Sequence, residues 1–565
     1  MIGVIPKSCQ VPVVEEFFEL FKTPWELYDP GQTYDVVIAT TDEVPEVNAR
    51  LLLVYGPNIK NIDERIGTRA AKWHQRAILS DGAASLPTYG EVVTFADSSI
   101  GTCCVSASCG IVGIRVCASD STVLRLGYDL FDEVKVVLSN GQPVEHAQIP
   151  TLDIHIRMLR NWILNEGISV LEIPPAPAGR SFAVCLTHDI DFVGIRNHKF
   201  DHTMWGFLYR STVGAIEKLL RGRISLTRFL KTWQAVASLP FVYLGWAKDF
   251  WEPFQWYLEI ERELNATYFF IPFKGLAGEK VPGAHAARRA ATYDLDELSK
   301  SISMLSAADC ELGVHGIDAW HNVEKGRAER SRLAEITGEP VNGIRMHWLL
   351  QDSNTPSLLE QAGFAYDSSV GYNDAVGYRA GTGQVYRPLN ARKLLELPLH
   401  IQDGALFYPQ RLDLSEPEAE KRCRALIDNA SEFGGVLTLV WHDRSHAPER
   451  FWGDFYIKLV RELKSFGAWF ATAGQVVGWF QKRRAVRFER TADNTGVRAM
   501  SEFETKELTS SLTLRIYRPL SATGNGKAST RSASVEDFCW DGKNAIDFDS
   551  TLQKMPHLSA AVPVL

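Results

Sequence analysis

Hydrophobic residues in the middle of the chain fall into short unbroken runs of strand length. The first run is FAVCLT, at residues 182–187, and a strand that is apolar on both faces is typical of the centre of a parallel sheet. Seven further runs follow it: ATYFFIPF, CELGVHG, NGIRMHW, FAYDSSV, LLELPLH, GGVLTLVWH and AWFATAG. Stretches with helical spacing alternate with several of them, among them LDELSKSISMLSAA and RFWGDFYIKLVRELKSFG. This alternation predicts a parallel α/β barrel or a doubly wound sheet.

The regions on either side of this alternation have other patterns. Residues 1–150 combine an amphipathic segment, VVEEFFELF, with strand-like runs such as YDVVIAT, ARLLLVYG, CGIVGIRVC and DEVKVVLSNG. They predict an N-terminal α/β domain whose role the sequence does not reveal. Residues 151–180 predict a helix and a Pro-rich linker. In residues 483–565 helical spacing fades, so we expect a small β-rich appendage or a partly disordered region. The strand–helix alternation thus occupies residues 181–482.

Composition narrows the functional class. The chain has 565 residues, of which 45% are hydrophobic and 23% charged, as in ordinary globular proteins. Lys and Arg number 60 against 68 Asp and Glu, a formal net charge of −8, which argues against a nucleic-acid binder because phosphate contacts need a basic surface. The N-terminus lacks the pattern of a secretory signal, and no run of about 18 apolar residues occurs. We therefore expect a cytoplasmic protein.

One segment departs from this acidic balance. Residues 195–250 contain an excess of Lys and Arg, followed by a dense series of aromatic residues. The pattern fits a solvated face over a buried contact with the barrel, which we favour. It also fits a basic, aromatic surface that lies peripherally on the inner face of an anionic membrane.

Polar residues follow five of the predicted strands, at the point where each strand ends. In a parallel α/β fold these ends meet at one rim, where ligands bind. A single such group usually caps the next helix, but five on a shared rim indicate a site. The groups are, in chain order, Asp189 with Asp191, His315 with His321, Arg345, Asp367 and His442.

The first two of these groups can hold a cation. Asp189 and Asp191 are two positions apart, so on an extended strand they face the same way. Two neighbouring carboxylates resist joint ionisation, unless one binds a divalent cation and leaves the other free as a base. His315 and His321 could complete an Asp/His/His set with open positions for water, the arrangement of a catalytic zinc-type site.

The remaining groups supply proton chemistry around such a cation. Arg345 would fix the free carboxylate by a charge-assisted contact. His442, arriving from another strand, could protonate a leaving amine. Together these residues predict metal-assisted hydrolysis of an amide or ester.

The motifs LTHDID, VHGIDAWH, GIRMHW, YDSS and VWH, in this order within residues 181–482, resemble those of the NodB-homology polysaccharide deacetylases, carbohydrate esterase family four, in its Asp-x-Asp branch. The resemblance implies a distorted (β/α)7-type barrel. It implies removal of N-acetyl or O-acetyl groups from an amino sugar, oligosaccharide or polysaccharide precursor, as in exopolysaccharide biosynthesis. The implied cofactor is a divalent metal, with Zn²⁺ expected and Co²⁺ or another divalent ion as alternatives.

The resemblance also assigns the metal ligands. Asp191 is the carboxylate ligand and His315 is the first histidine. The second histidine of the family falls four residues later, where this chain has Ala319. His321 is the substitute we favour because imidazole suits zinc, and Asp318 is the alternative.

The catalytic roles follow in the same way. The resemblance makes Asp189 the base, Arg345 the residue that orients it, and His442 the general acid, itself oriented by Asp367. The prolines that follow the arginine in the family are replaced here by Met346-His347.

Further polar residues near these motifs are candidates for contact with the substrate, each with a structural role as the alternative. They are His188, His347, Arg379, Thr382 and Arg444. Two other functions remain open: hydrolysis of a cyclic amide on the same scaffold, and a catalytically degenerate barrel that binds saccharide in polysaccharide assembly. The sequence does not indicate whether the protein has protein partners.

Overall fold

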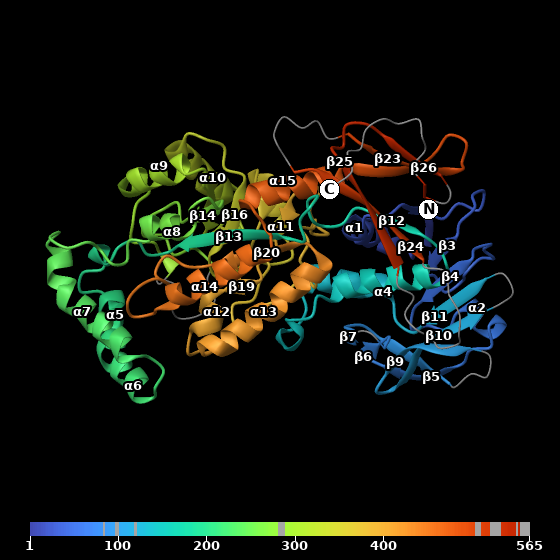
Figure 1. Cartoon of the computed structure of the whole chain (residues 1–565), viewed down its shortest axis with the longest axis horizontal. Helices are drawn as coiled ribbons and strands as arrows, with labels where there is room; N and C mark the ends of the chain where they lie inside the picture. Colours follow the sequence, from blue (N-terminus) through green and yellow to red (C-terminus); the bar gives the residue numbers. More distant parts are fainter. Residues whose placement is uncertain are drawn as a thin grey trace. The chain divides into compact units, whose positions relative to one another are not determined.

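A computed structural model describes residues 1–82, 85–96, 101–117, 121–280, 289–502, 510–519, 533–549 and 552–553. The chain forms two compact units of mixed α/β structure (Figure 1). The first comprises residues 1–179, 380–389 and 478–565, and the second comprises residues 180–379 and 390–477. The finer division into four segments that the sequence suggested stays a prediction.

The second unit is built on a sheet of nine parallel strands. Eight of them pair in the order β18-β17-β16-β15-β14-β13-β20-β19, and β21 pairs with β13. The strands are β13 (Ala183–Ile190), β14 (Ala266–Phe270), β15 (Glu311–Gly316), β16 (Gly343–Met346), β17 (Tyr366–Asp367), β18 (Leu395–Glu396), β19 (Ile401–Gln402), β20 (Val436–Val440) and β21 (Trp469–Phe470). Among the described strands no pairing joins β18 to β19. The sheet is therefore a distorted, open barrel, which confirms the predicted α/β fold class.

Every strand predicted for this unit from the sequence is present, and the structure adds β19. The run LLELPLH reads as one strand, but Pro398 interrupts it, since proline has no N–H for a sheet. Leu399 instead donates its N–H to Val370, and the chain re-enters the sheet at β19 beside β20.

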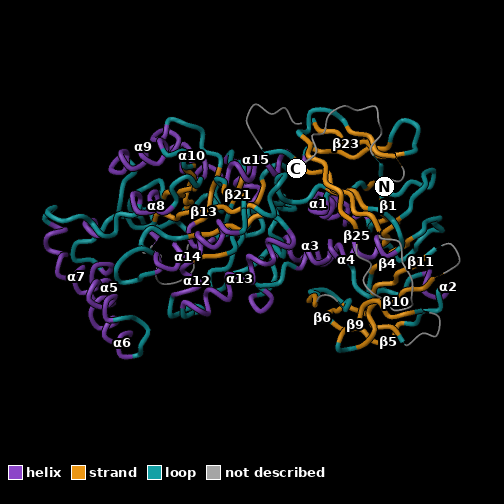
Figure 2. The backbone as a smooth tube through the Cα atoms, viewed as in Figure 1, coloured by secondary structure: helices purple, strands orange, loops and turns teal. Residues whose placement is uncertain are grey.

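Helices surround these strands in the backbone trace (Figure 2). They are α8 (Phe254–Ile260), α9 (Ser299–Ala307), α10 (Val323–Thr337), α11 (Thr355–Ala362), α12 (Asp403–Phe407), α13 (Glu416–Phe433) and α14 (Trp452–Ser465). On α14 the buried residues Phe455, Leu459 and Leu463 recur every four positions, so one face packs on the core. Each such fully buried side chain contributes about 1.5–3 kcal/mol.

A helical arm leaves the barrel after β13. It consists of α5 (His202–Tyr209), a π-helical turn η4 (Arg210–Gly214), α6 (Ala215–Leu220) and α7 (Leu226–Tyr243), and it extends away from the sheet strands in Figure 1. One face of the arm buries a small core that includes Phe207, Leu239 and Trp251. The arm is thus a packed element with its own hydrophobic contacts.

The described residues of the first unit form three sheets. The largest holds β1 (Ile2–Ile5), β2 (Trp25–Leu27), β3 (Val36–Ala39), β4 (Leu51–Tyr55), β5 (Ala70–His74), β6 (Ile78–Ser80), β7 (Ser85–Pro87), β8 (Val92–Phe95), β9 (Thr102–Ala107), β10 (Gly110–Cys117) and β11 (Thr122–Leu126). Two antiparallel sheets add β12 (Val170–Glu172) with β24 (Leu512–Pro519) and β25 (Ala533–Trp540), and β22 (Val486–Arg490) with β23 (Gly496–Ser501) and β26 (Ile546–Asp549). Strands β22–β26 fit the β-rich expectation for the C-terminal region. The alternative of a partly disordered region falls on residues outside those described.

The helices of this unit include one that the sequence analysis assigned wrongly. They are α1 (Val11–Phe21), α2 (Asn61–Arg65), α3 (Leu130–Asn140) and α4 (Thr151–Asn165), with α15 (Ala473–Arg484) running from the second unit into the first. The segment DEVKVVLSNG was expected to be a strand and is α3. The Asp129 side chain caps its start by accepting from the N–H groups of Phe131 and Asp132, and Gly141 ends it, signals that override the β-branched valines.

In the described part of the chain, no helix has both the length and the apolar character needed to cross a lipid bilayer.

Candidate active site

A cleft of about 590 Å³ lies at the carboxyl ends of the barrel strands. Asp189, Asp191, His315, His347 and His442 line it. The sheet order explains this convergence, since parallel strands deliver the residues at their carboxyl ends to one rim. The structure therefore brings together side chains that are as much as 253 positions apart.

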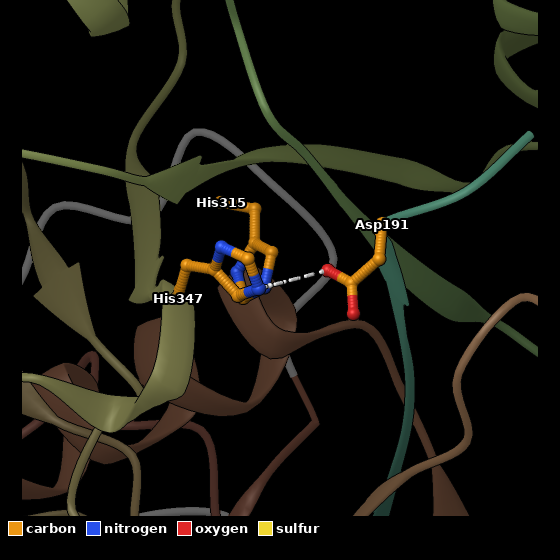
Figure 3. A group of neighbouring side chains, drawn as sticks. All are labelled: Asp191, His315 and His347. Carbon is orange, nitrogen blue, oxygen red and sulfur yellow. Dashed lines mark ion pairs between the residues drawn. The ribbon is translucent and has the colours of Figure 1, made fainter. Parts of the chain in front are cut away.

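Asp191, His315 and His347 form one group in which each residue offers a ligand atom (Figure 3). The Nε2 atom of His315 lies 3.3 Å from Asp191 Oδ1, and the Nε2 atom of His347 lies 3.5 Å from the same oxygen. The two imidazole rings are 4.8 Å apart between centroids.

The atoms of His315 and Asp191 that face one another are acceptors without a hydrogen between them, which is the arrangement that a metal cation needs. His315 Nδ1 is 2.9 Å from the carbonyl oxygen of Arg345; a carbonyl only accepts, so Nδ1 carries the hydrogen and Nε2 presents a lone pair. Asp191 Oδ1 is buried and accepts no hydrogen bond from the described residues. The spacings of 3.3 and 3.5 Å match the edges of a tetrahedron with bonds of about 2.0–2.2 Å. The three residues fit a divalent metal.

Burial and neighbouring charges set the ionisation of these ligands. Burial opposes ionisation of Asp191, but His347 and His315, when they are protonated at low pH, outweigh it and hold the pKa of the carboxyl well below its usual range. Burial lowers the pKa of His347 to about 3. A charged carboxylate and a neutral imidazole are the forms that bind metals.

His347 reaches this group because β16 ends in an unusual turn. The two residues after His347, Trp348 and Leu349, both have positive φ (64° and 54°). This left-handed region is one that non-glycine residues rarely adopt. Such backbone costs about 1–3 kcal/mol per residue and concentrates at functional sites. The turn ends the strand directly beside the metal-ligand candidates.

Asp189 lies next to this group and is held by Arg345. The Nη1 atom of Arg345 donates to Asp189 Oδ1 at 2.9 Å and to Thr187 Oγ1 at 2.6 Å, and its Nε donates to the Ser368 carbonyl at 3.0 Å. Burial opposes ionisation of Asp189, but the Arg345 guanidinium and the nearby His315 hold the pKa of the carboxyl below its usual value. Asp189 is thus a fixed, ionised carboxylate.

His442 faces the cleft from the end of β20 and is held by a residue that the sequence analysis missed. Its Nδ1 lies 2.6 Å from Asp403 Oδ1, and its backbone N–H donates to Asp403 Oδ2 at 2.8 Å. Ser445 Oγ donates to the same carboxylate. Since Nδ1 is used by Asp403, Nε2 is the nitrogen available to a substrate.

The charge on Asp403 keeps His442 protonated. Burial alone would lower the pKa of His442, but Asp403, with Asp191 and Asp189 further away, raises it to about 10. The imidazole is therefore protonated at neutral pH, as a general acid requires.

Two expectations from the sequence are corrected here. His321 does not join Asp191 and His315: its Nε2 lies 3.2 Å from Asp318 Oδ1, and both residues group with Glu279 instead. Asp367 does not contact His442. It accepts a hydrogen bond from Ser369, and burial raises its pKa to about 7.

The residues expected to contact the substrate divide into two sets. His347 and Arg444 line the cleft. His188 does not, because alternation along β13 turns it away from Asp189; its two ring nitrogens lie within 2.9 Å of the Trp441 carbonyl and 2.8 Å of Glu261.

The other two residues of that set also lie outside the lining. Arg379 donates to the backbone carbonyl of Gly371. Thr382 belongs to the first compact unit, where its hydroxyl donates to Asp153 at 2.8 Å.

The sequence did contain signals for His347 as a metal-ligand candidate and for Asp403, which the sequence analysis missed. His347 is two positions after Arg345, so it shares that residue's face if the extended chain continues. Asp403 directly follows the strand β19, in the same position at a strand end as the other site residues. The interruption at Pro398 hid this second signal.

Comparisons with known proteins give fold-level neighbours only. No protein-family model and no curated protein sequence matches the chain. Solved structures that it is similar to include deacetylases. Agd3, described as a novel carbohydrate deacetylase, is 10% identical over 95% of this chain and 98% of its own, with a TM-score of 0.36.

Two further structures cover the barrel region. The allantoinase Puue is 15% identical over 54% of this chain and 92% of its own, with a TM-score of 0.32. The polysaccharide deacetylase Bc1974 from Bacillus cereus is 12% identical over 52% of this chain and 91% of its own, with a TM-score of 0.24. Since each TM-score is below 0.5, we derive the function from the side chains of this chain.

Proposed function

We propose that this protein is a metal-dependent hydrolase that removes acetyl groups from an amino sugar or an oligosaccharide containing one. The observation that carries the proposal is the group Asp191, His315 and His347, in which a buried carboxylate oxygen without a hydrogen-bond partner among the described residues faces two imidazoles. A fixed carboxylate, Asp189, and a protonated imidazole, His442, line the same cleft. The saccharide substrate comes from the resemblance of the five strand-end motifs.

Asp191, His315 and His347 would hold the cation, and Zn²⁺ fits two nitrogen ligands and one oxygen ligand. When bound, the cation acidifies water and polarises the carbonyl group that is attacked. The remaining steps belong to residues of the chain itself.

Asp189 accepts the proton of the attacking water, because Arg345 keeps this carboxylate ionised and correctly oriented. His442 then donates the proton on Nε2 to the departing amine. Asp403 holds the imidazole through Nδ1 and stabilises its charge, as the carboxylate does in hydrolase triads. The cleft thus contains a base and an acid, each kept in its working protonation state by a buried partner.

The test is acetate release by purified protein loaded with Zn²⁺ or Co²⁺ and given N,N′-diacetylchitobiose. The Asp189→Asn variant should keep the metal and lose acetate release, because it loses a base and not a ligand. Asp428→Asn, at an exposed position on α13, removes the same charge elsewhere and should behave as wild type.

Two results would overturn the proposal. Opening of a cyclic amide without acetate release from any acetylated sugar would support the rival C–N hydrolase. A protein that binds no divalent metal and stays inactive with either ion would support the degenerate saccharide-binding scaffold.

We propose in addition that the helical arm, together with the residues that flank it (200–246), contacts an anionic membrane surface. More than half of the large hydrophobic side chains that are exposed in the described residues lie between 200 and 246, including Phe200, Leu220 and Trp246 at 81%, 84% and 76% exposure. Residues 195–250 also carry nine Lys or Arg against three Asp or Glu. An apolar surface with an excess of positive charge complements anionic phospholipid.

A further inference from the structure

The metal-ligand candidates occupy only one part of the cleft, and the rest is lined by arginines. Arg210, Arg411, Arg444 and Arg450 all line it, with Tyr408 among them. The mechanism proposed above uses none of these five residues. An acetylated neutral sugar offers no charge that four guanidinium groups could recognise.

Two of these arginines lie over aromatic rings and form no ion pair among the described residues; Arg444 is buried and Arg450 is half-buried. Arg444 is 9% exposed, and its guanidinium lies 3.8 Å from the ring centroid of Phe192 and 4.8 Å from that of Trp251. Arg450 lies 4.7 Å from the ring of Trp452 and 5.2 Å from that of Tyr408. In the described part of the chain, neither guanidinium makes a hydrogen bond or an ion pair to a carboxylate, although the charges of Asp443 and Glu449 act on both. Both guanidinium groups line the cleft, so their N–H donors are available to an anionic ligand there.

The other two arginines extend the same surface. Arg210 is the first residue of the π-helical turn, and its Nε is buried without a hydrogen-bond partner among the described residues. π-Helical turns occur frequently at functional sites. Arg411 lies 5.4 Å from the ring of Tyr408 and contacts Gln402 only at 3.5 Å.

The nearby carboxylates Asp443 and Glu449 form no ion pair with these arginines. Burial opposes the charge of Arg450, but Tyr408 and the nearby carboxylates raise its pKa above the usual value. Asp443 accepts from the N–H groups of Phe192 and Arg444, and Glu449 accepts from the indole N–H of Trp251. Burial lowers the pKa of Arg444, and repulsion from the positive charge of Arg450 lowers it further, to about 10. Four arginines carry more positive charge than a ligand with a single carboxylate would balance. A phosphate or diphosphate group has the higher negative charge that suits them.

We propose that the arginine-lined part of the cleft binds a phosphate or diphosphate group attached to the acetylated amino sugar. The substrate class is then a glycosyl phosphate, carried on a nucleotide or on a lipid, and not a neutral polymer. This inference rests on the proposed deacetylation for the sugar, but the anion site itself is independent of catalysis. A cleft of about 590 Å³ lies within the size range of sites for such ligands.

The first test measures binding of inorganic pyrophosphate to the metal-free full chain by calorimetry, so that neither metal nor turnover contributes. Arg444→Gln and Arg450→Gln should each weaken binding about 10–100-fold, the loss of a charged hydrogen bond. Arg327→Gln removes the same charge from an exposed residue of α10 and should leave the Kd unchanged. Thermal melting of each variant shows whether it is folded, and agreement of the two cleft variants guards against misfolding of either one.

The second test identifies the source of the phosphate. Uridine diphosphate N-acetylglucosamine and a polyisoprenyl diphosphate N-acetylglucosamine in detergent are compared with N,N′-diacetylchitobiose. If the wild-type protein binds one of the diphosphate compounds more tightly than the neutral disaccharide, and the Arg444 and Arg450 variants do not, the site is supported. The compound that is preferred then identifies the carrier as a nucleotide or a lipid.

The proposal is overturned if pyrophosphate does not bind, or if the Arg444 and Arg450 variants bind it as wild type does. Acetate release from diacetylchitobiose alone would then leave the deacetylase function standing. Conversely, pyrophosphate binding that depends on Arg444 and Arg450, in a protein that releases no acetate, would sink only the deacetylase proposal.

Discussion

At the scale of single residues, the site depends on which side chains share a face at the end of a strand. The sequence was sufficient to place Asp189, Asp191, His315, Arg345 and His442 together, because each follows an apolar run. It did not identify the third metal-ligand candidate, His347. The choice of His321 assumed that the loop after β15 brings this side chain back beside Asp191 and His315. In the structure His321 instead contacts Asp318.

The sequence favoured His321 as a ligand, whereas the structure places His347 beside Asp191, and this yields a direct test of the ligand set. His347→Ala should remove the metal, since it deletes an atom that lies 3.5 Å from Asp191 Oδ1, whereas His321→Ala should retain it. Metal content after dialysis, measured by plasma mass spectrometry, separates the two. Retention by the His347 variant together with loss by the His321 variant would reverse the assignment.

A second prediction concerns pH. Asp403 raises the pKa of His442 to about 10, so activity that needs protonated His442 persists at neutral pH and falls as the pH rises through that value. Asp403→Asn removes the negative charge and should move this alkaline limit down by about 1–3 pH units. Asp367→Asn, at a carboxyl that does not contact His442, should not move it. An unmoved limit in the Asp403 variant would contradict the pairing.

Loss of the acid itself should have a larger effect. His442→Ala should lower kcat about 10²–10⁴-fold, the usual scale for a general acid, with metal content unchanged. A variant that keeps full kcat would remove His442 from the proton transfer.

At the scale of elements, the apolar runs predicted the barrel strands well because a parallel sheet buries both faces. They failed where local signals competed with hydrophobicity. Pro398 split one run into β18 and β19, and the cap formed by Asp129 turned a valine-rich segment into α3. The exposure of the helical arm was the hardest feature to predict. Its many apolar residues give it the composition of a buried helix, although many of them are exposed.

The arm gives a prediction at this scale. The protein should float with vesicles that contain phosphatidylglycerol and not with pure phosphatidylcholine, and added salt should weaken the association. Leu220→Ser and Trp246→Ser should each reduce the bound fraction about tenfold, while Leu27→Ser, at an exposed leucine of β2, should not. Self-association through the arm, without lipid binding, would show that a second copy covers this surface.

At the scale of the whole molecule, ligand and stability are linked. A metal that binds only the folded chain stabilises it by about 2.7 kcal/mol at a free concentration 100 times the Kd, which corresponds to a rise of about 5 °C or more in the Tm of a domain of this size. Asp191→Ala should abolish the rise while leaving the metal-free Tm similar. An equal rise in this variant would place the stabilising metal elsewhere.

The central claim is that Asp191, His315 and His347 meet at one cation in the mouth of the barrel. A crystal structure of the Zn²⁺-loaded protein, with an anomalous difference map at the zinc absorption edge, tests it most directly. We predict one strong peak about 2.0–2.2 Å from the Asp191 carboxylate and from Nε2 of both histidines. A peak at Asp318 and His321 instead, or none near Asp191, would contradict the account.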